Sequence, residues 1–164
     1  MKAEKLMAQI DFDEFLKNLD SDPSKEADYV LLTCMDFRFF LTISEKMKGK
    51  KYDQLILAGA ALGVVGGKED WHDTFFDHLD LAIELHGIQT VIVMEHRDCG
   101  AYGPPPGFGL LPDKPDPDEE RRVHCQQVEK LRELISKDYS DLKFCSFLLA
   151  VPPTTQELTF DQLE

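Results

Sequence analysis

The sequence lacks long apolar runs. No stretch approaches the roughly 20 apolar residues that a helix needs to cross a bilayer. Residues 1–15, MKAEKLMAQIDFDEF, carry charges where a signal peptide would have its apolar segment. We therefore expect a cytoplasmic protein that has no membrane partner.

Positive charge is also scarce. The formal net charge is −13 at pH 7, and only KMKGKK at 46–51 gathers several basic side chains. That run is typical of the solvated end of a helix followed by a turn. Because the remaining field repels phosphate backbones, we expect no nucleic-acid partner.

Cysteine is limited to four residues in a chain of 164. This length suits a single domain over residues 1–164, large enough to bury a core without disulfides. In a cytoplasmic chain the cysteines are expected to be free thiols or metal ligands. Cys125 in the middle of a helix and Cys145 in the middle of a strand have core-like neighbours, so we interpret both as structural.

The pattern that is present is an alternation of apolar strands and amphipathic helices. Strands are predicted from 29, over 52–60, 88–96 and 142–151, and helices over 1–20, 39–49, 73–86 and 119–139. This order indicates an α/β fold with a mostly parallel central sheet of about four strands flanked by helices. The proline- and glycine-rich segment 103–118 is predicted to be a surface loop, either a lid beside a site or a plain connection.

Reactive side chains follow two of these strands. Cys34, Asp36 and Arg38 come after the first strand, and His96 and Cys99 end the third in an H-x-x-C arrangement. Open α/β sheets place their sites at the carboxyl edge, where these strand ends meet. Two sulfurs and an imidazole nitrogen suit a tetrahedral zinc ion and leave its fourth position for water or a carboxylate.

Asp36 is the carboxylate in reach of that fourth position. If Arg38 pairs with Asp36, the acid stays ionised, away from the metal and able to accept a proton. If the pair breaks, Asp36 could close the site as a ligand. The glycine-rich segment 59–70 fails the phosphate-loop pattern at Leu62 and Glu69, so it is interpreted as a turn against the metal site.

The paired motifs LTCMDFR and EHRDCGA resemble those of the β-class carbonic anhydrases, and LAGA at 57–60 is similar to that family's glycine turn. The resemblance implies a zinc lyase that reversibly hydrates carbon dioxide to bicarbonate through a zinc-bound hydroxide. It implies a homodimer or higher homo-oligomer, with the N-terminal helical arm 1–20 lying across the partner or covering its own core. The roles it implies are zinc ligands for Cys34, His96 and Cys99, catalysis for Asp36 and Arg38, and a substrate pocket at Gly59 and Gly100.

Several positions depart from that family's pattern. Phe37, Leu57 and Ala60 replace polar residues, and Glu95 and Arg97 flank His96 where small or hydroxyl residues are usual. Glu95 and Arg97 are expected either to form a surface ion pair or to reshape the pocket.

These departures leave three further functions open. They are a catalytically silent zinc protein, a hydrolase of carbonyl sulfide or carbon disulfide, and a redox protein that uses Cys34 and Cys99 as a dithiol. Among the other histidines, His72 near the glycine turn is the candidate proton shuttle. Surface or capping positions are expected for the rest: His78, His86 and His124.

Overall fold

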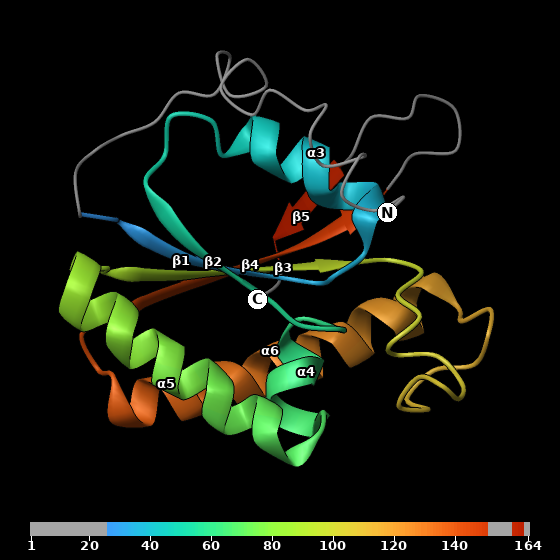
Figure 1. Ribbon diagram of the computed structural model, residues 1–164. Helices are drawn as coiled ribbons and strands as arrows, with labels where there is room; N and C mark the ends of the chain where they lie inside the picture. The colour runs from blue at the N-terminus through green and yellow to red at the C-terminus, as the bar shows by residue number, and fades with distance from the viewer. Residues whose placement is uncertain (1–25, 151–158, 163–164) are drawn as a thin grey trace, which may run out of the picture.

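The computed structural model describes residues 26–150 and 159–162 (Figure 1). The predicted N-terminal helical arm 1–20 lies outside the described residues. Among the helices that are described, none has the length and apolar character needed to span a membrane.

A central sheet organises the described residues. Its strands are β1 Tyr29–Thr33, β2 Tyr52–Ile56, β3 Thr90–His96, β4 Lys143–Ala150 and β5 Thr159–Gln162. They lie in the order β2-β1-β3-β4-β5. The first four strands are parallel, which confirms the predicted α/β sheet. β5 pairs antiparallel with β4 and was not predicted.

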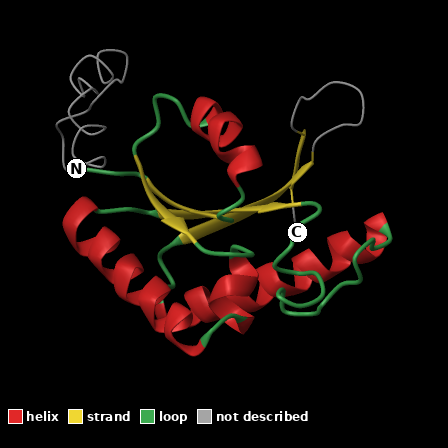
Figure 2. Cartoon of the chain, turned by 45° about the vertical axis from the view of Figure 1, so that its right-hand side comes forward, coloured by secondary structure: helices red, strands yellow, loops and turns green. Residues whose placement is uncertain are grey.

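Helices cover both faces of this sheet. α3 Phe37–Lys46 lies on one face, and α4 Ala61–Gly66, α5 Glu69–His86 and α6 Pro117–Asp138 lie on the other (Figures 1 and 2). Side chains of β1 alternate between the two layers. Leu31 packs with Phe39 and Ile43 of α3, whereas Val30 and Leu32 belong to the core under α5 and α6. Two buried layers explain why each central strand is a nearly continuous apolar run.

The order of the strands creates a switch point between β1 and β3. After β1 the chain passes through α3 to β2, whereas after β3 it passes through α6 to β4 on the opposite side. The two connections leave the sheet in different directions, so a crevice forms beyond the carboxyl ends of β1 and β3. Cys34 and His96 stand at these two ends.

Some boundaries differ from the sequence-based expectation. The glycine-rich segment, expected to be a turn, contains the short helix α4. α5 begins at Glu69, four residues earlier than expected, and α6 begins at Pro117, inside the predicted 103–118 loop. A side chain explains the start of α6: the Asp116 carboxylate accepts hydrogen bonds from the N–H groups of Asp118 and Glu119, and proline suits the first helical position.

Candidate metal centre

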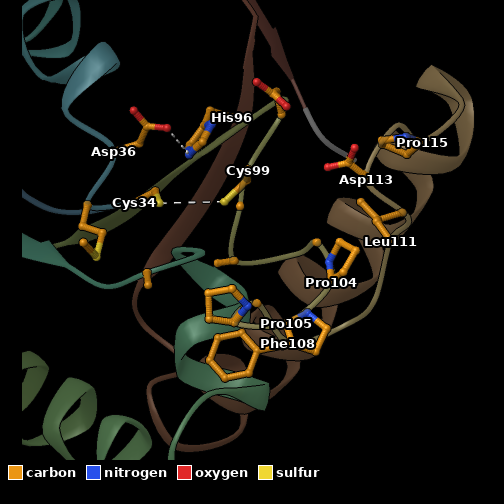
Figure 3. A pocket seen from close by; sticks show the side chains of 18 of the residues that line it. Cys34, Asp36, His96, Cys99, Pro104, Pro105, Phe108, Leu111, Asp113 and Pro115 are labelled. Carbon is orange, nitrogen blue, oxygen red and sulfur yellow. Dashed lines mark hydrogen bonds and ion pairs between the residues drawn. The ribbon is translucent and has the colours of Figure 1, made fainter.

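Two thiols and one imidazole converge beyond the ends of β1 and β3 (Figure 3). Cys34 follows β1, His96 is the last residue of β3, and Cys99 lies in the turn after it. One ligand atom from each of the three lies within 4.8 Å of the others, and the two sulfurs are 3.8 Å apart. Both cysteines are free thiols. The structure therefore brings together the three residues that the sequence predicted as ligands.

The ring of His96 is oriented with one nitrogen free. Its Nδ1 lies 2.8 Å from the Arg97 carbonyl oxygen, so this nitrogen carries the proton and donates it. Its Nε2 is buried without a hydrogen-bond partner among the described residues. The Phe39 ring packs on the imidazole with its centroid 4.4 Å away. A metal-binding histidine usually donates its other ring N–H to a hydrogen-bond acceptor, which fixes the tautomer. In His96 the Nδ1 atom makes that bond, so the Nε2 atom is the one that fits a metal ion.

The two thiols are electrostatically unequal. The hydrogen bond with Cys99 lowers the pKa of Cys34, and His96 and the Gly59 N–H group, 3.3 Å from the sulfur, act in the same direction against burial. The same hydrogen bond, together with burial, raises the pKa of Cys99. The hydrogen bond between the two sulfurs thus favours a thiolate in this pair. A soft thiolate donor is what a zinc ion requires, so this donor set fits the metal.

The side chains of Asp36 and Arg38 form an ion pair at the start of α3. The Arg38 Nε and Nη2 atoms donate to both carboxylate oxygens of Asp36 at 2.7–3.0 Å, and the Arg38 backbone N–H donates to Asp36 as a helix cap. This guanidinium lowers the pKa of Asp36. The Asp36 Oδ2 atom lies 3.8 Å from His96 Nε2. Asp36 is therefore ionised, held by Arg38 and aimed at the nitrogen that could bind the metal.

Arg38 also holds the loop between His96 and Cys99. Its Nη1 and Nη2 atoms each donate at 3.1 Å to Asp98, one to the side chain and one to the carbonyl oxygen. Asp98 has a left-handed backbone with φ of 55°. On its other side the Asp98 N–H donates to Glu120 at 2.6 Å, and Glu120 pairs with Arg97 at 2.8 Å. The loop that carries two of the three donors is thereby fixed to both α3 and α6.

Glu95 is the functional candidate that the sequence missed. Of the two alternatives expected for Glu95 and Arg97, the surface ion pair is wrong, because the side chain of Glu95 is 1% exposed and Arg97 pairs with Glu120. Its Oε1 accepts from the Ala61 N–H at 2.8 Å, and its Oε2 accepts from the Tyr102 hydroxyl at 3.1 Å and from His124 Nδ1 at 2.9 Å. Burial and the charge of Glu95 raise the pKa of Tyr102, which keeps the phenol protonated as a donor. The surface or capping position expected for His124 is also wrong, since its side chain is fully buried.

The three candidate ligands border a cavity of about 930 Å³. Asp36, Arg38 and Gly100 also line it, whereas Gly59 does not and instead contacts the site through its N–H bond to Cys34. His72, the candidate proton shuttle, is absent from the lining. It borders a different hollow and packs on Phe76. Cys125 and Cys145 pack against the two cores, as expected for structural residues.

Comparisons with known proteins identify the family. A family model described as "Putative carbonic anhydrase" matches residues 24–148, more than half of the chain. An uncharacterized protein of Rickettsia conorii is 29% identical over 150 residues, which cover 88% of this chain and 76% of the relative.

Solved structures show a common fold. The carbonic anhydrase of Streptococcus mutans superposes with a TM-score of 0.60 at 15% identity, covering 99% of this chain and 96% of that one. The apo form of a carbon disulfide hydrolase gives 0.52 at 18% identity, covering 96% and 90%. The chain therefore belongs to the family described as putative carbonic anhydrase, and it shares the fold of these solved structures.

Proposed function

We propose that this protein binds zinc through Cys34, His96 and Cys99 and catalyses the reversible hydration of carbon dioxide to bicarbonate. The observation that carries the proposal is the grouping of two sulfurs and an unpartnered imidazole nitrogen within 4.8 Å, beside an ionised aspartate. Zinc bound there would lower the pKa of a water molecule to about 7, so that a hydroxide nucleophile exists at neutral pH.

The protein's own residues supply the proton acceptor. Asp36 is ionised at neutral pH because Arg38 lowers its pKa, and one of its oxygens points toward His96 Nε2. Since Arg38 engages both oxygens, Asp36 stays in place to accept a proton rather than swinging toward the sulfurs as a ligand. Phe39 and the Arg97 carbonyl hold the imidazole ring, which limits the movement of a ligand during turnover.

Replacing Asp36 tests whether this residue accepts a proton or binds the metal. Asp36→Asn is expected to retain stoichiometric zinc and to lower the rate of carbon dioxide hydration about 10²–10⁴-fold, the usual contribution of a general base. Stopped-flow hydration assays on protein of measured zinc content test this. Asp141→Asn, at an exposed turn remote from the site, serves as the matched control. Loss of zinc in Asp36→Asn would instead identify Asp36 as a ligand, and unchanged hydration would remove it from the mechanism.

A second candidate is the hydrolysis of carbonyl sulfide or carbon disulfide. Its support is the apolar part of the cavity lining, which includes Trp71, Phe108 and Leu111. Carbonyl sulfide and carbon disulfide are less polar than bicarbonate and need fewer hydrogen-bond donors. The carbon disulfide hydrolase among the structural neighbours shares the fold. Zinc-loaded protein that hydrates none of the three molecules would favour the third candidate, a silent zinc protein.

We also propose that the protein forms a homodimer or a higher homo-oligomer. Four apolar side chains next to the site are exposed: Met35 at 69%, Phe37 at 86%, Phe40 at 52% and Leu41 at 72%. Phe37, Phe40 and Leu41 are three and four residues apart on α3 and so share one face of the helix. Exposed apolar side chains grouped in this way typically mark an interface.

A charged residue placed among these apolar side chains tests whether the chains associate through them. Leu41→Glu is expected to reduce the mass in solution to that of one 18.7 kDa chain, because a buried, unpaired carboxylate opposes association. Light scattering after size exclusion gives the mass. Leu85→Glu on α5, where the leucine is 63% exposed, is the control expected to keep the parent mass. A parent protein that is already monomeric would contradict the proposal.

A further inference from the structure

We propose that the cavity beside the metal centre takes a substituted heterocumulene, an organic isothiocyanate R–N=C=S, and that the protein adds water to it. The N=C=S group would lie at the Cys34–His96–Cys99 end, and an aromatic or alkyl R group would lie against the far wall. This inference rests on the proposed function, because it uses the same metal and the same nucleophile.

The volume of the cavity exceeds what carbon dioxide needs. A cavity of about 930 Å³ corresponds to about 30 water molecules at their liquid volume. Carbon dioxide has three heavy atoms and fills a small part of that space. Cavities of roughly 300–1,000 Å³ are the ones that bury drug-sized ligands. This volume is that of a single chain, because Met35 and Phe37 line the cavity and also belong to the proposed subunit interface. Within one chain it leaves room for a substituent beyond the reactive group.

The wall opposite the ligands has the chemistry of an aromatic or alkyl site. Trp71 and Phe108 meet edge to face with ring centroids 6.1 Å apart, and both line the cavity. Figure 3 shows Pro104, Pro105 and Phe108 across the cavity from Cys34 and Cys99. The charged residues of the cavity lining are Asp36, Arg38, Lys68, Asp98, Asp113 and Glu120. Arg38 binds Asp36 and Asp98 beside the metal ligands. A neutral apolar group fits such a wall, with its polar end directed to the ligands.

This wall is preformed. The loop after Cys99 folds back on its own start: the N–H groups of Phe108 and Leu111 donate at 2.8 Å to the carbonyls of Ala101 and Tyr102. Gly107 packs so closely on the Gly100 carbonyl that a Cβ atom would lie 2.3 Å from that oxygen. The sequence left open either a lid beside the site or a plain connection. These contacts instead favour a fixed wall of the site. A ligand that binds there would not have to order the loop first.

The reaction needs no reagent beyond water. The oxygen of water bonds to the central carbon of R–N=C=S, the electron pair of the C=N π bond moves to nitrogen, and nitrogen takes up one proton of the water. The second proton passes from oxygen to sulfur as the C=S π pair moves to sulfur and a C=O bond forms. The product is the thiocarbamic acid R–NH–C(=O)–SH, which breaks down to the amine R–NH₂ and carbonyl sulfide. As in carbon dioxide, the attacked carbon lies between two heteroatoms in a linear group. The difference is the substituent, which the apolar wall would hold.

Binding can be measured without turnover, because Trp71 is the single tryptophan of the chain and lines the cavity. The probe is phenylthiourea, an unreactive compound that retains the phenyl–N–C–S skeleton, and thiourea is the control without the ring. Phenylthiourea is expected to change the Trp71 emission saturably and to bind at least tenfold more tightly than thiourea, in both zinc-free and zinc-loaded protein. Equal affinities, or no change in emission, would overturn the proposal.

Two substitutions test where phenylthiourea binds in the cavity. Phe108→Ala is expected to weaken phenylthiourea binding about tenfold, whereas Leu85→Ala, at an exposed leucine outside the lining of this cavity, leaves it unchanged. Gly100→Leu is the second variant, because a Cβ there meets no atom within 4 Å and the side chain would extend into the cavity. It should abolish the emission change while zinc content, measured on the same samples, is retained. Parent-like affinity in both Phe108→Ala and Gly100→Leu would show that the ring binds elsewhere.

The activity assay separates this inference from the proposed function. Zinc-loaded protein and Cys34→Ser are each mixed with phenyl isothiocyanate, and released aniline is measured, since adducts with lysine or cysteine release none. Faster aniline release by the zinc-loaded protein supports the inference. Carbon dioxide hydration without probe binding or aniline release overturns the inference alone. Failure of both hydration reactions in zinc-loaded protein overturns the proposed function and the water-addition step together.

Discussion

Cys34→Ser is expected to lower the affinity for zinc by about two to three orders of magnitude and to abolish zinc-dependent hydration. Binding free energies of about 10–16 kcal/mol for four-ligand zinc sites correspond to about 3–4 kcal/mol per ligand. At 1.4 kcal/mol per tenfold change, the loss of one thiolate gives this fall. Serine replaces one of the two sulfur donors by a hydroxyl group, which is a poorer zinc ligand than a thiolate.

Metal content by mass spectrometry and affinity by competition with a chromophoric chelator measure the effect. Cys145→Ser is the matched control, because this thiol lies in β4 with its sulfur 3.9 Å from the Val91 carbonyl oxygen and outside the candidate ligand group. The control is expected to bind zinc like the parent protein. A Cys34→Ser variant that retains stoichiometric zinc with parent affinity would contradict the proposed centre.

The parts of the site that depend on strand ends were predictable from sequence. Apolar runs identify β1 and β3 as buried strands, and parallel buried strands deliver their following residues to one edge. Cys34 and His96 therefore had to lie near each other if the two strands were neighbours. Strand adjacency itself follows from a doubly wound order, in which β1 and β3 flank the switch point.

Contacts across the site were not predictable, because they depend on residues remote in sequence. Glu95 is satisfied by Ala61 and by His124, which lie 34 and 29 residues away along the chain. The side chain of a glutamate at a strand end can point toward either face of the sheet. Only the packing of α4 and α6 decides which face it points to. One feature of the sequence did indicate that Glu95 is buried. Its carboxyl group follows four apolar residues, in VIVMEH, at a strand position that faces a helix layer.

The proline- and glycine-rich loop and β5 were also not fully predictable from the sequence. Prolines and glycines at 103–116 exclude regular structure, but they do not reveal that Phe108 and Leu111 bond back to the turn after Cys99. β5 has only four residues, TFDQ, of which three are polar, so no apolar run marks it. It is a strand because the edge of β4 offers unpaired backbone groups, which is a property of the folded sheet.

Glu95→Gln is expected to destabilise the protein by about 2–4 kcal/mol, because three donors face the carboxyl group. An amide keeps the shape but places its own N–H groups against the donors of Ala61 or of Tyr102 and His124. At least one buried donor then loses its acceptor. For a domain of this size the midpoint of thermal unfolding should fall by about 5–15 °C. Glu84→Gln, an exposed glutamate on α5, should leave the midpoint unchanged.

The same substitution should weaken zinc binding about 10–100-fold, the usual effect of removing an outer partner of a metal site. Glu95 holds the Ala61 N–H, and the turn before Ala61 carries Gly59, whose N–H donates to Cys34. Glu95 also holds Tyr102 in the turn after Cys99 and directly precedes His96. Tyr102→Phe removes one of the three donors and leaves two, so a smaller fall in stability and affinity is expected. If Glu95→Gln lowers the unfolding midpoint but leaves zinc affinity unchanged, the buried carboxyl group supports the fold and plays no part in positioning the ligands.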